Sequence, residues 1–171
     1  MMRVVSGQFR GRRLISPQGR DTRPTTEKVR EAVFNALGSL DRIVDAAVVD
    51  LYAGTGALGL EALSRGAAHC TFVENDRAAL EALRHNIEHL GVDDRARVIR
   101  GDALTSARTL TGDLVLADPP YGVDPWDELL SVTPVDLVVA EAPSPVTAPD
   151  GWTELRSRRY GRTWVTFLER E

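Results

Sequence analysis

The sequence predicts an α/β fold built on a mostly parallel β-sheet. Short apolar runs alternate with amphipathic segments between about residues 46 and 140, which implies right-handed crossovers and a parallel sheet covered on both faces. The last third of the chain changes character. There, Trp152 to Ser157 and Thr163 to Leu168 flank a turn at Tyr160-Gly161, a pattern typical of an antiparallel hairpin.

Each expected element follows from apolar periodicity and turn residues. The pairs Val4-Val5 and Leu14-Ile15 flank a glycine-containing bend and predict an N-terminal hairpin. The next helix has Pro24 just ahead of a cap at Thr25 or Thr26, and an apolar stripe of Val29, Ala32, Val33, Ala36 and Leu37. Further strands are expected at about 46–51, 69–74, 96–100, 113–117 and 135–140, and helices at about 57–65, 76–90 and 125–131.

Length and composition indicate one compact core. The chain has 171 residues, 43% of them hydrophobic, and no apolar run as long as a membrane span. Cys70 is the one cysteine and lies in a predicted buried strand, so we expect a small core residue rather than a nucleophile. The histidines show no metal-ligand spacing. These features predict a cytoplasmic protein without a metal site.

A glycine-rich turn follows the strand predicted at 46–51. Gly54, Gly56 and Gly59 satisfy G-x-G-x-x-G, and Glu74 lies 20 residues beyond Gly54 at the end of another strand. This spacing also fits a dinucleotide site, in which the acid binds a ribose. Asp50, four residues before the first glycine, would repel a pyrophosphate but suits a ligand that carries a sulfonium and an ammonium group.

The most informative stretch is Asp118-Pro119-Pro120-Tyr121, which directly follows the apolar run from Leu114 to Ala117. A buried strand that ends in an acid, two prolines and an aromatic residue opens into a rigid loop. Neither proline can donate a backbone hydrogen bond, so we expect both carbonyls to point outward as unpaired acceptors. A carboxylate, a carbonyl and an aromatic face would together hold a planar group that bears an exocyclic amine. An ordinary strand-to-turn junction is the simpler alternative.

The charge distribution is uneven along the chain. Residues 1–35 carry eight basic groups and three acids, a net +5, which leaves −9 on the other 136 residues of a chain of net charge −4. A second basic cluster near the C-terminus contains Arg156, Arg158, Arg159 and Arg162. Two basic clusters on an acidic body predict a localised phosphate-binding surface. Base composition of the genome could explain the preference for arginine, but it does not explain the missing acids.

These motifs carry a family resemblance. The run from Leu116 to Tyr121 resembles the catalytic motif of amino-methyltransferases that use S-adenosylmethionine (SAM), and Val48 to Gly59 resembles their SAM-binding motif. Four further segments are similar to the bacterial small-subunit rRNA guanine-N2 methyltransferases of the RsmD type. They are Arg3 to Leu14, Arg23 to Asn35, Leu51 to Ala67, and Arg159 to Thr163.

The resemblance implies a Rossmann-like class I methyltransferase with a mostly parallel seven-stranded sheet. Residues 1–40 would form a basic RNA-binding extension of hairpin and helix, and residues 41–171 the SAM-dependent domain. The implied substrate is the N2 amine of a guanine in 16S rRNA, presented on the assembling small ribosomal subunit. We expect a monomer without an obligate protein partner.

The resemblance also implies roles for individual residues. Asp118 and the Pro119 carbonyl would accept the amine hydrogens, while Tyr121 would stack on a flipped base. Glu74 would accept the ribose hydroxyls, and Asp102 would lie beside the adenine amine. The implied SAM-binding set is Asp50, Tyr52, Ala53, Gly54, Gly56, Glu74, Asn75, Asp102 and Ala103. The implied RNA-binding set is Arg10, Arg12, Arg13, Arg23, Arg158, Arg159 and Arg162.

Other functions share parts of this pattern. An adenine-N6 methyltransferase acting on DNA or RNA would carry both motifs, although many such enzymes have Asn in place of Asp118. An NAD-dependent oxidoreductase would share only the glycines, and a non-catalytic assembly factor would have lost one motif. About fourteen residues separate Tyr121 from the next predicted strand, so the helix there should be short. The resemblance implies that this segment shapes the base pocket, so its length bears on the choice of target base.

Overall fold

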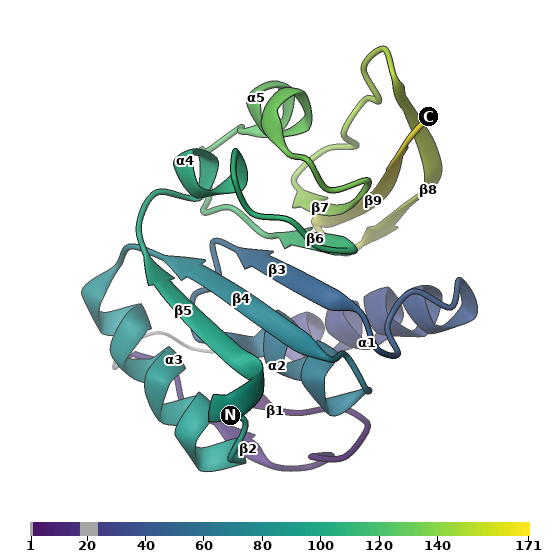
Figure 1. Cartoon of the computed structure of the whole chain (residues 1–171). Helices are drawn as coiled ribbons and strands as arrows, with labels where there is room; N and C mark the ends of the chain where they lie inside the picture. The colour runs from purple at the N-terminus through teal and green to yellow at the C-terminus, as the bar shows by residue number, and fades with distance from the viewer. Residues whose placement is uncertain (1, 18–23) are drawn as a thin grey trace.

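The fold is a single seven-stranded sheet with helices on both faces (Figure 1). The computed structural model describes residues 2–17 and 24–171. The strand order is β5-β4-β3-β6-β7-β9-β8, in which β9 and β8 are antiparallel to their neighbours and the other pairs are parallel. These strands are β3 (Ala47–Leu51), β4 (His69–Glu74), β5 (Ala96–Arg100), β6 (Leu114–Ala117), β7 (Leu137–Ala142), β8 (Trp152–Tyr160) and β9 (Thr163–Arg170). The predicted fold class is confirmed.

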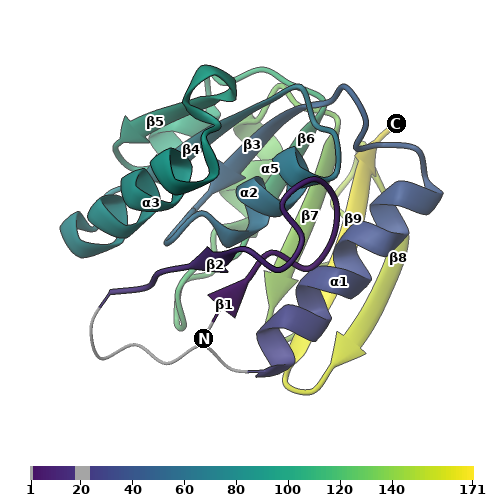
Figure 2. The same cartoon turned by 90° about the horizontal axis from the view of Figure 1, so that it is seen from below.

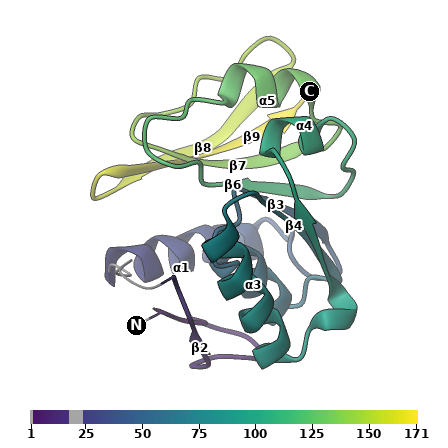
Figure 3. The ribbon, with the colours of Figure 1, turned by 90° about the vertical axis from the view of Figure 1, so that its left-hand side faces the viewer.

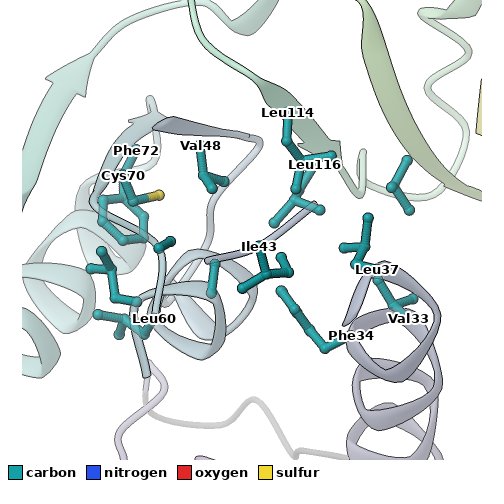
Figure 4. Packing of buried hydrophobic residues seen from close by; sticks show 14 of the residues in the cluster. Val33, Phe34, Leu37, Ile43, Val48, Leu60, Cys70, Phe72, Leu114 and Leu116 are labelled. Atoms are coloured by element: carbon teal, nitrogen blue, oxygen red, sulfur yellow. The ribbon is translucent and has the colours of Figure 1, made fainter. Parts of the chain in front are cut away.

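Alternation along each strand divides the core into two layers (Figure 3). Leu114 and Leu116 of β6 pack toward α1 (Pro24–Ser39), α2 (Ala57–Ser64) and α3 (Arg77–Leu90). Figure 4 shows this layer, where Phe34 and Leu37 of α1 face the sheet. Val115 and Ala117 pack the other way, toward α4 (Ala103–Ala107) and α5 (Trp126–Val132). A strand buried on both faces in this way is typical of a parallel sheet.

The N-terminal hairpin is shorter than predicted and begins earlier. β1 (Met2–Arg3) pairs with β2 (Arg13–Leu14), rather than Val4-Val5 with Leu14-Ile15. The intervening loop is instead held by the end of α2, because the Gln8 amide donates to the Ser64 carbonyl at 2.8 Å and the Phe9 amide to Ser64 Oγ at 3.0 Å. Gly7, at φ +87°, allows this approach, since a Cβ there would lie 2.0 Å from the Ser64 carbonyl oxygen.

Other boundaries agree closely with the sequence, with specific differences. α1 begins at Pro24, so the expected cap at Thr25 or Thr26 is wrong; proline suits the first turn because the amide it lacks would be unpaired there. α4 and the 3₁₀ turn η1 (Asp93–Arg95) were not predicted, because both are too short for a clear period. β8 extends to Tyr160 and contains a register shift between Glu154 and Arg156. Among the described residues, no helix is long and apolar enough to cross a membrane.

Candidate active site at the carboxyl edge of the sheet

A cavity of about 480 Å³ opens where the parallel strands end. Glu74, Asp118 and Glu141 lie at or just beyond the ends of β4, β6 and β7, and all three line this cavity. Ligands of open parallel sheets bind at this edge. The other lining residues are Met2, Arg30, Tyr52, Ala53, Gly54, Thr55, Ala57, Leu58, Asn75, Asp76, Ala79 and Pro120.

The loop after β3 shapes one wall of the cavity. Tyr52 has φ 57°, an uncommon left-handed conformation for a non-glycine residue and one that often marks a functional site. Gly54 lines the cavity, whereas Gly56 and Gly59 serve packing. A Cβ on Gly56 would lie 2.4 Å from Leu83 Cδ1, and one on Gly59 would lie 2.3 Å from Phe72 Cε1. The glycine motif therefore lets the loop and α2 approach β4 and α3 closely.

The Glu74 carboxylate is held in place by backbone amides. Its Oε1 accepts from Gly54 N at 2.8 Å, and its Oε2 accepts from the amides of Asn75 and Asp76, each at 2.8 Å. A carboxylate offers about four acceptor positions, so the protein uses three of them. One acceptor position remains. A ribose bound through both of its hydroxyls would therefore have to compete with one of these amides for the carboxylate. The ribose contact of Glu74 stays a prediction.

Four of the predicted cofactor residues lie outside the cavity wall, namely Asp50, Gly56, Asp102 and Ala103. Asp50 is 1% exposed beneath the loop, where its Oδ2 accepts from Gly59 N at 3.0 Å. Burial raises the pKa of Asp50 well above its ordinary value. Asp102 caps α4 by accepting from the Thr105 amide and hydroxyl, both at 2.9 Å, and these bonds lower its pKa. Ala103 is buried in α4. Any contact of these residues with SAM stays a prediction.

The Asp-Pro-Pro-Tyr segment contributes two residues to the cavity wall. Asp118 and Pro120 line the cavity, and loss of hydration raises the pKa of Asp118 to about 6 although the residue is accessible from the cavity. The expectation of two unpaired carbonyls is wrong for Pro120, because the Val123 amide donates to its oxygen at 3.1 Å in the following turn. Tyr121 is 99% exposed, so its ring is available for stacking.

Sequence reasoning missed several residues of the cavity, among them Glu141 and Arg30. Ala117 pairs with Ala140 in parallel register, which puts Glu141 beside Asp118 on the neighbouring strand. Burial raises the pKa of Glu141 well above its ordinary value, and the charges of Asp118 and Asp50 raise it further. Arg30 reaches the cavity from α1. A signal for Arg30 was present in the sequence, since it precedes Val33 and Leu37 by three and seven residues and thus lies on the buried helix face.

The predicted arginines divide between the two edges of the sheet. Arg12 donates to the carbonyl of His89 at the end of α3, at 2.7 Å, on the edge opposite the cavity. Arg158, Arg159 and Arg162 are exposed around the β8–β9 turn, beyond the carboxyl end of β7 (Figure 2). Arg10 and Arg13 are exposed in the N-terminal hairpin. Arg23 lies outside the described residues.

The sheet order, the loop after β3 and the Asp-Pro-Pro-Tyr segment at the same edge together define a Rossmann-like methyltransferase. The chain belongs to the family described as "Conserved hypothetical protein 95", which it matches over residues 2–169.

Named relatives agree with this class. The chain is 36% identical over 186 residues to "Putative rRNA methyltransferase YlbH" of Bacillus subtilis, covering 99% of both chains. It is 35% identical to "Ribosomal RNA small subunit methyltransferase D" of Escherichia coli over 182 residues, covering 99% of this chain and 90% of the relative. Among solved structures, the Escherichia coli protein described as "Putative methyltransferase yhhF" superposes with a TM-score of 0.86 at 34% identity, covering 99% of this chain and 98% of the other.

Proposed function

We propose that this protein transfers a methyl group from SAM to the exocyclic N2 amine of a guanine in 16S rRNA, on the assembling small ribosomal subunit in the cytoplasm. The observation that carries the proposal is Asp118 in the cavity wall, followed three residues later by the exposed ring of Tyr121. The names of the full-length relatives support an rRNA substrate from the small subunit. The base and the acceptor atom rest on the resemblance of the N-terminal segments to guanine-N2 enzymes.

The composition of the cavity wall suits SAM. Glu74 lines the cavity at the end of β4, the position of the acid that binds a ribose in such sheets, and keeps one free acceptor position. Asp118 and Glu141 would complement the positive sulfonium and ammonium groups. When bound, SAM supplies a methyl group that is already activated on a cationic sulfur, so the protein needs no covalent nucleophile.

The protein's own contribution is placement of the acceptor amine. The lone pair of an exocyclic amine is delocalised into the base, which makes the nitrogen a poor nucleophile. Asp118 and the Pro119 carbonyl accept its two hydrogens, favour a more tetrahedral nitrogen and aim the lone pair at the cavity. Tyr121 stacks on the flipped base and fixes its plane. The methyl carbon would exchange its bond to sulfur for a bond to nitrogen, which leaves a neutral thioether. The nitrogen would then be cationic and would lose a proton to solvent, so Asp118 need not be a strong base.

The basic clusters would bind the RNA backbone. Arg158, Arg159 and Arg162 are close to the proposed target site in the sheet and would contact the nearest phosphates. Arg10, Arg12 and Arg13 would contact phosphates farther from the target, which a substrate as large as a ribosomal subunit can supply. The two clusters would thus act at different distances from the reacting base.

Transfer of radiolabelled methyl groups from SAM tests the proposal. The substrates to compare are small subunits that lack the modification, naked 16S rRNA and duplex DNA, followed by nucleoside analysis. We expect label in N2-methylguanosine from the subunit particle. Label in N6-methyladenine, or on DNA, would instead support the adenine-N6 alternative and overturn the proposed substrate.

A further inference from the structure

Arg30 has one donor group that the protein itself does not use. The side chain is 2% exposed, and its Nε donates to Glu61 Oε1 at 3.2 Å, while Nη2 donates to the Arg3 carbonyl. Within the described part of the chain, no atom accepts a hydrogen bond from the buried Nη1. A buried charged donor without a partner is costly, and such groups in native structures call for an explanation. Because Arg30 lines the cavity, a bound ligand can supply the missing acceptor.

The charges around the cavity show which ligand group would bind there. Arg30 is the one basic side chain among the described residues that line the cavity, whereas Glu74, Asp76, Asp118 and Glu141 are acidic. SAM carries two positive groups and a single carboxylate. The acidic side chains would repel that carboxylate everywhere except beside Arg30. Glu141 is near enough for its charge to interact with that of Arg30, so it would face the ammonium group attached to the same carbon.

We propose that Arg30 binds the carboxylate of the amino-acid end of SAM through Nη1, with Glu141 next to the ammonium group. This inference rests on the proposed function, because it assumes that SAM occupies the cavity. It makes α1, in the N-terminal extension, part of the cofactor site. Arg30 is thereby a specificity-determining residue that selects SAM over related thioethers and sulfonium compounds without a carboxylate.

The surroundings of Arg30 hold its guanidinium ready for this contact. Glu61 is fully buried and also accepts from the amides of Val5 and Ser6, at 2.8 and 3.0 Å, and from Arg65 Nε at 2.9 Å. The hairpin, α1 and α2 therefore meet at one carboxylate. A guanidinium fixed in this way loses little side-chain entropy when a ligand binds, which favours affinity.

Calorimetric titration of the unaltered protein tests the proposal, with SAM compared with decarboxylated SAM. Removal of the carboxylate makes the ligand one charge more positive, so an acidic cavity without an arginine contact would bind it more tightly. We expect the opposite result, about tenfold to a hundredfold weaker binding of decarboxylated SAM, because a charge-assisted hydrogen bond is lost. Equal or tighter binding of decarboxylated SAM would overturn the role of Arg30 and leave the proposed function intact. No binding of either compound would remove the proposed function and this inference together.

A pair of variants separates ligand contact from structural support. In Arg30→Met, the preference for SAM over decarboxylated SAM should disappear or reverse. Arg65→Met is the matched control, because Arg65 also pairs with Glu61 but does not line the cavity. It should keep the preference at the level of the unaltered protein, and loss of the preference in both variants would contradict direct contact. If thermal melting shows that Arg30→Met does not fold, the comparison of ligands on the unaltered protein decides the question.

Discussion

The N-terminal hairpin turn and the β8–β9 turn look alike in the sequence but lie at opposite edges of the sheet. Both contain glycine and several arginines. The N-terminal turn is held by the carboxyl-terminal ends of α2 and α3, through Ser64 and His89, at the edge where the parallel strands begin. The β8–β9 turn lies beyond the carboxyl end of β7, at the edge of the sheet where the cavity opens. Arginine clusters that look alike in the sequence can therefore lie at different distances from the cavity.

The same contrast holds within one strand. Asp113 precedes β6 and accepts the Ala47 amide at 2.8 Å, whereas Asp118 follows β6 and lines the cavity. Asp113 joins the beginnings of β3 and β6, whereas Asp118 faces the cavity. The difference explains why an acid at a carboxyl strand end is a better sign of function than an acid at an amino strand end.

The largest effect is expected for Asp118→Ala. Methyl transfer should fall about a hundredfold to a thousandfold, because an interaction aimed at the reacting amine is lost, while SAM affinity changes less than about threefold. Asp113→Ala is the control at the other end of β6 and should retain turnover in single-turnover assays. Normal turnover per bound complex in Asp118→Ala would disprove the catalytic role.

Removal of the arginines should distinguish the two turns. The combined change Arg158→Ala, Arg159→Ala and Arg162→Ala should raise KM for the subunit about tenfold to a hundredfold and reduce the slope of log affinity against log salt by about two. Arg10→Ala should raise KM less than about threefold, because that residue lies far from the cavity. Measurement of KM at several salt concentrations checks both, and a larger effect for Arg10→Ala would reverse the comparison.

The pH dependence of the methyl-transfer rate should show the ionisation of Asp118, the acid at the carboxyl edge of the sheet. Loss of hydration raises the pKa of Asp118 to about 6, and the ionised carboxylate accepts its amine hydrogen without donating one, while its charge stabilises the cation that forms on the nitrogen. The single-turnover rate should therefore rise with pH through this range, with about a tenfold gain between pH 5 and pH 7. The profile of Asp118→Asn, which cannot ionise, should lack this step. If Asp118→Asn kept the step, another group would be responsible for it.

The smallest effects are expected on the free energy of unfolding, when glycines of the two turns are replaced. Gly7→Ala should lower the free energy of unfolding by about 2–4 kcal/mol, since the new Cβ would collide with the Ser64 backbone. Gly161, at φ +63°, has no atom within 4 Å of the position that a Cβ would occupy, so Gly161→Ala should cost only about 1 kcal/mol of backbone strain. Urea denaturation of both variants measures the difference. Equal losses would show that the N-terminal turn is not firmly held.

Much of the site could be read from local patterns. The apolar runs of β3, β4 and β6 predicted strands, and the acids after those runs predicted Glu74 and Asp118 at one edge, because parallel strands share their direction. Glu141 also meets this rule, because it directly follows the strand expected at 135–140, and it could have been predicted in the same way. The place of Arg30 in the cavity was not predicted, because a single charged residue on an apolar helix face gives no indication of which group it contacts.

The sequence by itself determined the layered α/β fold, the glycine loop and the acid at the end of β6, because these depend on periods of two and 3.6 residues and on turn residues close together in the chain. Only the tertiary structure decided which polar groups line the cavity and which lie behind it. Asp50 is buried under the loop, Arg30 reaches the cavity from α1, and the two arginine clusters lie at opposite edges. Those placements depend on register and packing between segments far apart in the chain, which no local pattern contains.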